Sequence, residues 1–130
     1  MPLSRRKAVP GAVLVGAMLA AALMVASPGG AASTQKLGLR ASASGALKFN
    51  KKTLRARPGR IKVTLTNPSG SGLRHAVEVE GHGIEKESRT IGPGKRASVT
   101  VRVKAGTYEF YCPVDGHKAA GMRGKLVVKR

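Results

Sequence analysis

The chain has 130 residues, and its 24 Lys and Arg against six Asp and Glu give a formal net charge of +18 at pH 7. Six acidic residues leave little basis for paired-carboxylate catalysis, and neither a Gly-rich phosphate loop nor a Ser/His/Asp order is present. A single Cys excludes a disulfide within the chain, so that Cys needs another role: an intermolecular bridge, a reactive thiol or a metal.

The first 32 residues have the organisation of an export signal. A basic stretch at residues 4–7 precedes an uncharged run rich in Ala, Val and Leu at residues 8–26, and small, helix-breaking residues follow as far as Ala32. The paired arginines partly match a twin-arginine signal. We predict cleavage after Ala32; the alternative is a retained anchor, because residues 8–26 are just long enough to span a bilayer. In both cases we expect an extracytoplasmic protein: periplasmic, on the cell surface or secreted.

Without residues 1–32, the chain has 98 residues with 21 basic and six acidic side chains, which suffices for one domain with a modest core. Residues 33–46 contain few large apolar side chains, and the stretch from Ala41 to Ala46 is typical of a flexible connector. A weak strand at residues 37–40 precedes this connector. We therefore predict a flexible N-terminal segment at residues 33–46, with a first strand in it, and a domain at residues 47–130.

From residue 47 onward, apolar and polar side chains alternate with a period of two. Ile61, Val63 and Leu65 alternate with polar residues, as do the valines of residues 99–103. Turn signals, such as residues 67–70 and 92–94, separate these stretches. The pattern predicts strands with one buried face, and no helix, in an antiparallel sandwich or barrel. The predicted strands lie near residues 47–49, 53–56, 60–67, 74–79, 97–104, 107–112 and 124–129.

The segment from Tyr111 to Met122 contains the one Cys of the chain, one of its three His and, once the signal is removed, its one Met. Cys112 ends a predicted strand, and His117 and Met122 follow at intervals of five residues. Thiolate, imidazole and thioether are soft or borderline ligands that select copper, and a thioether is a poor ligand for zinc. Each residue alone is more often structural, but their joint placement indicates a copper site. A second imidazole would complete a His₂Cys set with an axial Met, as in blue copper sites.

Two histidines outside this segment could supply the second imidazole. His75 follows a turn and opens an apolar alternation, so its side chain can enter the sandwich from a neighbouring strand. His82 lies between two glycines beyond the end of that strand, a pattern typical of a solvated loop. We assign His75 as the ligand and His82 as a surface residue.

Two segments, "NPSGSGLRHAVEVEG" (67–81) and "GTYEFYCPVDGHKAAGMRGKLVV" (106–128), resemble the cupredoxin family, specifically its small plastocyanin-like blue (type 1) copper proteins. The resemblance extends over residues 37–130 and includes the Cys-x₄-His-x₄-Met spacing. It implies an antiparallel Greek-key β-sandwich of seven or eight strands. It also implies electron transfer by one copper ion, cycling between Cu(I) and Cu(II), rather than catalysis. The implied copper ligands are His75, Cys112, His117 and Met122.

The residue after the first His departs from this family pattern. Family members often have an Asn there, whose side chain ties the two ligand-bearing segments together, whereas this chain has Ala76. Bonds of this kind orient metal ligands, so the substitution bears on the reduction potential and the rigidity of the site.

The resemblance also implies a docking surface around His117, the partly exposed ligand. Small apolar residues would surround its ring and two basic residues would flank them: Pro113, Ala119, Ala120 and Gly121, with Lys118 and Arg123. We expect an acidic redox partner, such as a haem protein or an oxidase domain, steered by the positive charge of a monomeric protein.

Other functions are less compatible with the residues. A multicopper oxidase or a copper nitrite reductase needs additional His ligands, and a dinuclear copper centre needs two Cys, so catalysis is not expected. Copper delivery is an alternative, although four ligands inside a sandwich favour retention. Seven basic residues between Lys48 and Lys62 could hold the protein near anionic lipids or envelope polymers, and a metal-free polyanion-binding domain is a further alternative. Nucleic acid is not an expected partner, because export removes it and two Phe and two Tyr offer little stacking.

Overall fold

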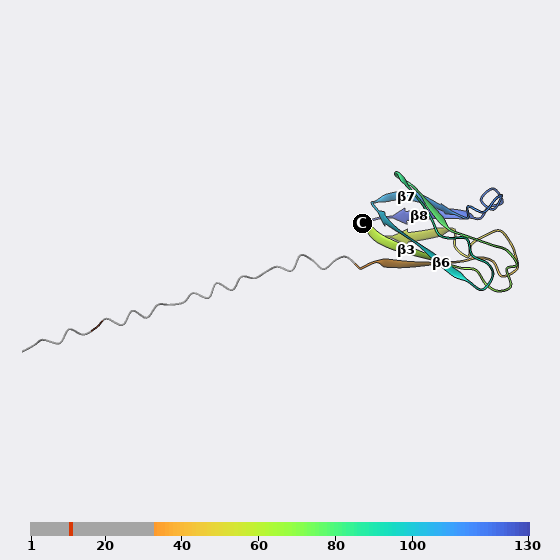
Figure 1. Cartoon of the computed structure of the whole chain (residues 1–130). Coiled ribbons are helices and arrows are strands. Elements are labelled where there is room, and N and C mark those ends of the chain that lie inside the picture. Colours follow the sequence, from red (N-terminus) through yellow and green to blue (C-terminus); the bar gives the residue numbers. More distant parts are fainter. Residues whose placement is uncertain (1–10, 12–32) are drawn as a thin grey trace, which may run out of the picture.

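The computed structural model of the chain describes residue 11 and residues 33–130 (Figure 1). The predicted export signal or anchor at residues 1–32 therefore lies outside the described residues, with the exception of Gly11. Within the part that is described, no helix has the length and apolar character needed to cross a membrane.

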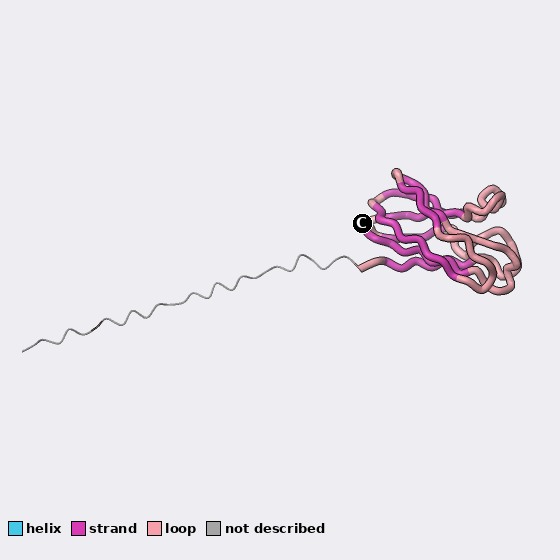
Figure 2. Tube along the Cα trace, in the orientation of Figure 1, coloured by secondary structure: helices cyan, strands magenta, loops and turns pink. Residues whose placement is uncertain are grey.

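Eight strands form two packed sheets, with long loops at one end (Figures 1 and 2). The three-stranded sheet has the order β1-β3-β6, and the five-stranded sheet has the order β2-β8-β7-β4-β5. No helix occurs among the described residues, and the predicted all-β sandwich is confirmed. The strands are β1 (Gln35–Arg40), β2 (Thr53–Ala56), β3 (Gly59–Thr66), β4 (Glu78–Gly81), β5 (Ile84–Glu87), β6 (Arg96–Val103), β7 (Gly106–Tyr111) and β8 (Arg123–Val128).

Both sheets are mixed, which corrects the expectation of purely antiparallel pairing. β1 runs parallel to β3, β2 runs parallel to β8, and the remaining pairs are antiparallel. The chain passes from one sheet to the other between β1 and β2, and again between β2 and β3. A hairpin therefore joins neither β1 to its neighbour β3 nor β2 to its neighbour β8, and both pairs can be parallel. The alternation of side chains is the same in both kinds of pairing and therefore could not reveal this.

The strand boundaries differ from the predictions in three places. The strand predicted at residues 47–49 is only an isolated bridge between Phe49 and Ala41. The strand predicted at residues 74–79 is divided, because His75 forms an isolated bridge with Ile91 and β4 begins at Glu78. β5 was not predicted, since its sequence, IEKE, has one partly buried apolar residue followed by three exposed charged ones.

The core lies between the two sheets and extends to the candidate site. The fully buried side chains of Ile61 and Val63 lie opposite Val101 and Val99 in the register of β3 and β6. From the other sheet, Phe110 belongs to the same buried cluster, and so do Cys112 and Met122 just beyond the strand ends. The site is therefore a continuation of the core at the end of the sandwich opposite the C-terminus (Figure 1).

Candidate metal centre

The Cys112–Met122 segment, here called the ligand loop, is a closed loop between β7 and β8. The Cys112 amide donates to the carbonyl oxygen of Met122 over 3.0 Å, directly beyond the last register pair of the two strands, Tyr111 and Arg123. The Met122 amide in turn donates to the carbonyl oxygen of His117 over 3.1 Å. The backbone therefore holds the three sulfur- and nitrogen-bearing residues of the loop close together at its base.

The compact shape of the ligand loop depends on two glycines. Gly116 and Gly121 have φ of 77° and 109°, in the left-handed region that side chains disfavour. Between them, the amide of Ala120 donates to the carbonyl oxygen of Gly116 over 3.1 Å, which closes a tight turn. An earlier turn, in which the His117 amide donates to the carbonyl oxygen of Val114 over 3.0 Å, brings His117 back towards Cys112.

His75 comes from a different part of the chain and is fixed by its backbone. Its amide donates to the Ile91 carbonyl oxygen over 3.0 Å, and its own carbonyl oxygen accepts from the Ile91 amide over 2.8 Å. The fully buried Asn67 supports this bridge, because its side-chain Nδ2 donates to the carbonyl oxygens of Leu73, over 2.8 Å, and Ile91, over 3.1 Å. The Ser71 hydroxyl completes the network by donating to Asn67 Oδ1 over 2.5 Å.

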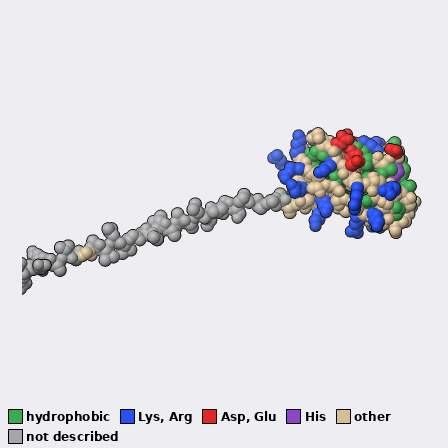
Figure 3. Space-filling view, in the orientation of Figure 1, with side chains coloured by type: hydrophobic (Ala, Val, Ile, Leu, Met, Phe, Trp, Pro, Cys, Tyr) green, Lys and Arg blue, Asp and Glu red, His purple; other side chains and the backbone are tan. Residues whose placement is uncertain are grey.

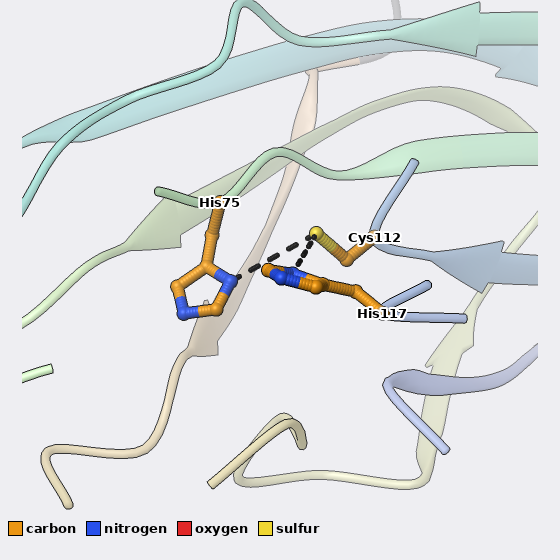
Figure 4. A group of neighbouring side chains, drawn as sticks. All are labelled: His75, Cys112 and His117. Carbon is orange, nitrogen blue, oxygen red and sulfur yellow. Dashed lines mark hydrogen bonds between the residues drawn. The ribbon is translucent and has the colours of Figure 1, made fainter. Parts of the chain in front are cut away.

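The three side chains meet in a buried group (Figure 4). The Cys112 Sγ lies 3.4 Å from His117 Nδ1 and 3.9 Å from His75 Nδ1, and the candidate ligand atoms all lie within 4.8 Å of one another. Both imidazoles thus turn the same nitrogen towards one sulfur. No carboxylate belongs to this group, so the donors are those that copper prefers. The residues present fit a copper ion.

The outer ring nitrogen of His75 has no carboxylate or carbonyl partner among the described residues. A metal-binding histidine normally donates its second ring N–H to a carboxylate, a carbonyl or water. Among the described residues, none forms a hydrogen bond with His75 Nε2, which is buried. The ring is therefore oriented by packing and by the backbone bridge to Ile91.

Burial favours the neutral form of both Cys112 and His75. It raises the pKa of the Cys112 thiol, while the backbone amides of Ala76 and Val114, which favour the thiolate, oppose that shift. Burial also lowers the pKa of His75, and the nearby His117 adds to this effect. Metal binding requires a thiolate and neutral imidazoles, so His75 is prepared for it and Cys112 has to release a proton.

Met122 and His82 occupy contrasting positions. Met122 is completely buried and belongs to the core cluster that contains Cys112. His82 is exposed, has a φ of 50° and lies with its ring 4.8 Å from that of Tyr108. It is not part of the group formed by His75, Cys112 and His117.

The residues predicted to form the docking surface are mostly accessible. Ala119, Ala120, Gly121 and Arg123 are exposed, and Pro113 is half-buried. Lys118, however, is already engaged: its Nζ lies 3.0 Å from Glu109 Oε1 and 3.8 Å from the centre of the Tyr111 ring. Its positive charge is therefore largely matched within the protein.

The sequence reasoning missed the residues that hold His75 in place. Asn67 was interpreted only as part of a turn signal, and Ser71 and Ser88 were not considered. The Ser88 hydroxyl accepts from the Val77 amide over 3.0 Å, next to the buried Ala76. The signal available in the sequence was that Asn67 continues, directly after β3, the inward-facing series of Ile61, Val63 and Leu65.

The comparisons with known proteins agree with this geometry. The model of the family described as copper binding proteins, plastocyanin/azurin family, matches residues 38–129. None of the curated proteins matches the chain.

Among solved structures, auracyanin B is 22% identical, with 74% of this chain and 89% of that chain covered and a TM-score of 0.66. Reduced auracyanin from the photosynthetic bacterium Roseiflexus castenholzii is 20% identical over 75% and 99% of the two chains, also with a TM-score of 0.66. Copper nitrite reductase from Nitrosomonas europaea is 23% identical over 75% of this chain and 42% of that chain, with a TM-score of 0.63. These similarities show a shared fold, and the family model that spans most of the chain shows more: the protein belongs to the plastocyanin/azurin family of copper-binding proteins.

Proposed function

We propose that this protein is an exported blue copper protein that carries single electrons between redox partners, with His75, Cys112, His117 and Met122 as the copper ligands. The observation that carries the proposal is the buried group in which both imidazole Nδ1 atoms face Cys112 Sγ. Met122 is proposed as the fourth ligand because it is buried in the same cluster and its backbone bonds to both Cys112 and His117. Copper in such a ligand set supplies reversible one-electron chemistry.

The contribution of the polypeptide is to keep the ligands in place and dry. The backbone bonds of His75 to Ile91 and of Cys112 to Met122 resist movement of the side chains when the charge of the site changes. Cys112 and Met122 are fully buried, so a copper ion held by the four ligands would be shielded from water and would have no coordination position left for a substrate. Such a site favours electron transfer over catalysis.

Catalysis is not part of the proposal, although a copper nitrite reductase shares the fold. The chain has three His, and two of them belong to the buried group. The third, His82, is exposed and packs against Tyr108, so it cannot complete a second copper site by itself.

Electrons would enter and leave through His117. His117 is 9% exposed, whereas His75, Cys112 and Met122 are 0% exposed. The exposed Ala119 and Ala120 beside it offer a small-residue surface against which a partner can pack closely.

We propose an acidic partner, which the net positive charge of the monomeric protein would attract. Since Glu109 matches Lys118, this attraction rests on Arg123 and on the remaining basic residues. The rate constant of electron transfer to an acidic haem protein should therefore fall as ionic strength rises, and a flat or rising dependence would contradict an acidic partner.

The ligand assignment is tested by adding Cu(II) to the purified apo protein. We expect one copper ion per chain and an intense visible charge-transfer band from the copper–thiolate bond. Cys112→Ser should abolish the band, and His82→Gln, the matched control at the histidine outside the group, should retain it. A colourless protein that takes up no copper stoichiometrically would refute the assignment.

The same preparation separates electron transfer from copper delivery. Reversible one-electron waves in cyclic voltammetry, with the copper retained in both oxidation states, support a carrier. Rapid loss of copper upon reduction would support delivery and contradict the proposed function.

A further inference from the structure

The outer face of the three-stranded sheet has an unusual composition. Outward positions in the register of β1, β3 and β6 are the even-numbered residues, because the odd-numbered ones turn towards the core. These outward positions contain one Gly, four Ser or Thr, and six Lys or Arg, with no acidic and no apolar residue. The six basic residues, here called the cationic face, are exposed: Lys36, Arg40, Arg60, Lys62, Arg96 and Arg102.

The arrangement of these charges works against the stability of the sheet. In the register, Lys36 lies opposite Lys62, and Arg60 lies opposite Arg102. Like charges directly opposite each other on neighbouring strands destabilise a sheet. In residues 33–130 the one ion pair within 4.0 Å is Lys118 with Glu109, so no ion pair of the cationic face offsets this repulsion.

The acidic residues are segregated to the other side of the sandwich. All six lie between residues 78 and 115, on β4, β5, β7 and the ligand loop. In Figure 3 the acidic side chains gather on the upper part of the domain, whereas Lys and Arg project from its lower and left sides. A general excess of positive charge does not require basic and acidic residues to lie on different faces. A surface that binds anions does require a face without acidic residues.

We propose that the cationic face is a docking surface for an anionic lipid bilayer. Its basic residues are distributed over three neighbouring strands, which gives a two-dimensional array about 10 Å wide and 25 Å long. Such an array matches a plane of anionic headgroups better than a single polymer chain, which would follow one line. The absence of apolar side chains from these outward positions means that the contact is peripheral and electrostatic.

Docking on this face would orient the candidate metal centre. The strands would lie parallel to the membrane plane, so the end of the sandwich that holds the ligand loop would point sideways along the membrane (Figure 1). His117 would then face a redox protein in the same membrane. The lipid contact itself does not depend on copper or on the proposed electron transfer, and the apo protein should show it equally.

The test measures binding of the full chain to vesicles with 30 mol% phosphatidylglycerol in phosphatidylcholine, and to vesicles of phosphatidylcholine alone. Each basic residue near an anionic membrane contributes about fivefold in affinity at low salt. The triple variant Lys36→Gln, Lys62→Gln, Arg102→Gln should therefore bind the anionic vesicles about 100-fold more weakly. The control triple variant Arg55→Gln, Lys125→Gln, Lys129→Gln removes the same charge from exposed positions on and after β2 and β8, and should lose less than fivefold.

Each result bears on the proposal directly. Binding to phosphatidylcholine alone, to which residues 8–26 could contribute, should be equal in all three proteins. Equal weakening of both triple variants on anionic vesicles would overturn the proposal, because net charge alone would then explain binding. Soluble polyphosphate that displaces the protein as effectively as anionic vesicles at equal phosphate concentration would also overturn it, in favour of a polymer. Circular dichroism checks the fold, and the single variant Lys62→Gln, with about fivefold loss expected, replaces the triple variant if that one unfolds.

Discussion

Asn67 offers the sharpest test of how the protein positions His75. It is 0% exposed, and its side chain takes part in three hydrogen bonds, two donated to the carbonyl oxygens of Leu73 and Ile91 and one accepted from the Ser71 hydroxyl. Each such bond contributes about 1 kcal/mol net, so Asn67→Ala should lower the free energy of unfolding by about 3 kcal/mol. For a domain of this size, that corresponds to a fall in Tm of about 12 °C or more.

Urea unfolding of the apo protein measures this loss, with Ser98→Ala as the control. Ser98 is exposed and shares one hydrogen bond of 2.8 Å with Thr64, so its replacement should cost less than about 0.5 kcal/mol. Because Asn67 bonds to the same Ile91 carbonyl as His75, we also expect about 10- to 100-fold weaker copper binding in Asn67→Ala. A loss of stability below about 1 kcal/mol would refute the view that this network fixes the His75 segment.

Two further predictions concern the packing and the titration of the site. Gly124→Ala should destabilise the fold by about 2 kcal/mol, because a Cβ there would overlap the Phe110 ring and lie 2.5 Å from the Lys52 carbonyl oxygen. The control Gly38→Ala, whose Cβ would have no atom within 4 Å, should change the free energy of unfolding by less than about 0.5 kcal/mol. Thermal unfolding compares the two variants. Burial lowers the pKa of His75 in the folded state, so the unfolded chain takes up this proton at a higher pH and the apo protein should lose stability as the pH falls below about 6.5. The urea midpoint should thus be lower at pH 5.5 than at pH 7.5, and a difference as large in His75→Gln as in the wild type would contradict this origin.

The candidate site could be predicted from the sequence because its donors are rare and closely spaced. One Cys, one His and one Met within a single segment between two strands leave few alternatives, and the structure brings Cys112 and His117 together with His75 as expected. Met122 lies in the same cluster, but its role as a ligand stays a prediction. Ligand chemistry and spacing are local properties, and the sequence expresses them directly.

The interactions that hold His75 could not be predicted in the same way. The contact between Asn67 and Ile91 spans 24 residues, and nothing in a turn signal shows which carbonyl a buried amide will reach. The parallel pairing of β1 with β3 and the position of β5 were missed for a related reason. Strand direction and the pairing of charged edge strands depend on neighbours in space, and period-two alternation contains no information about them.

The closed ligand loop has a consequence for the order in which the site is assembled. Three of the four proposed ligands lie on one hairpin, while His75 is separated from Cys112 by 37 residues. An ion bound to all four would therefore act as a cross-link that joins a locally formed hairpin to a distant segment and restricts the unfolded chain. Losing His75 would leave the hairpin able to capture metal but would uncouple that capture from the folding of the remaining domain.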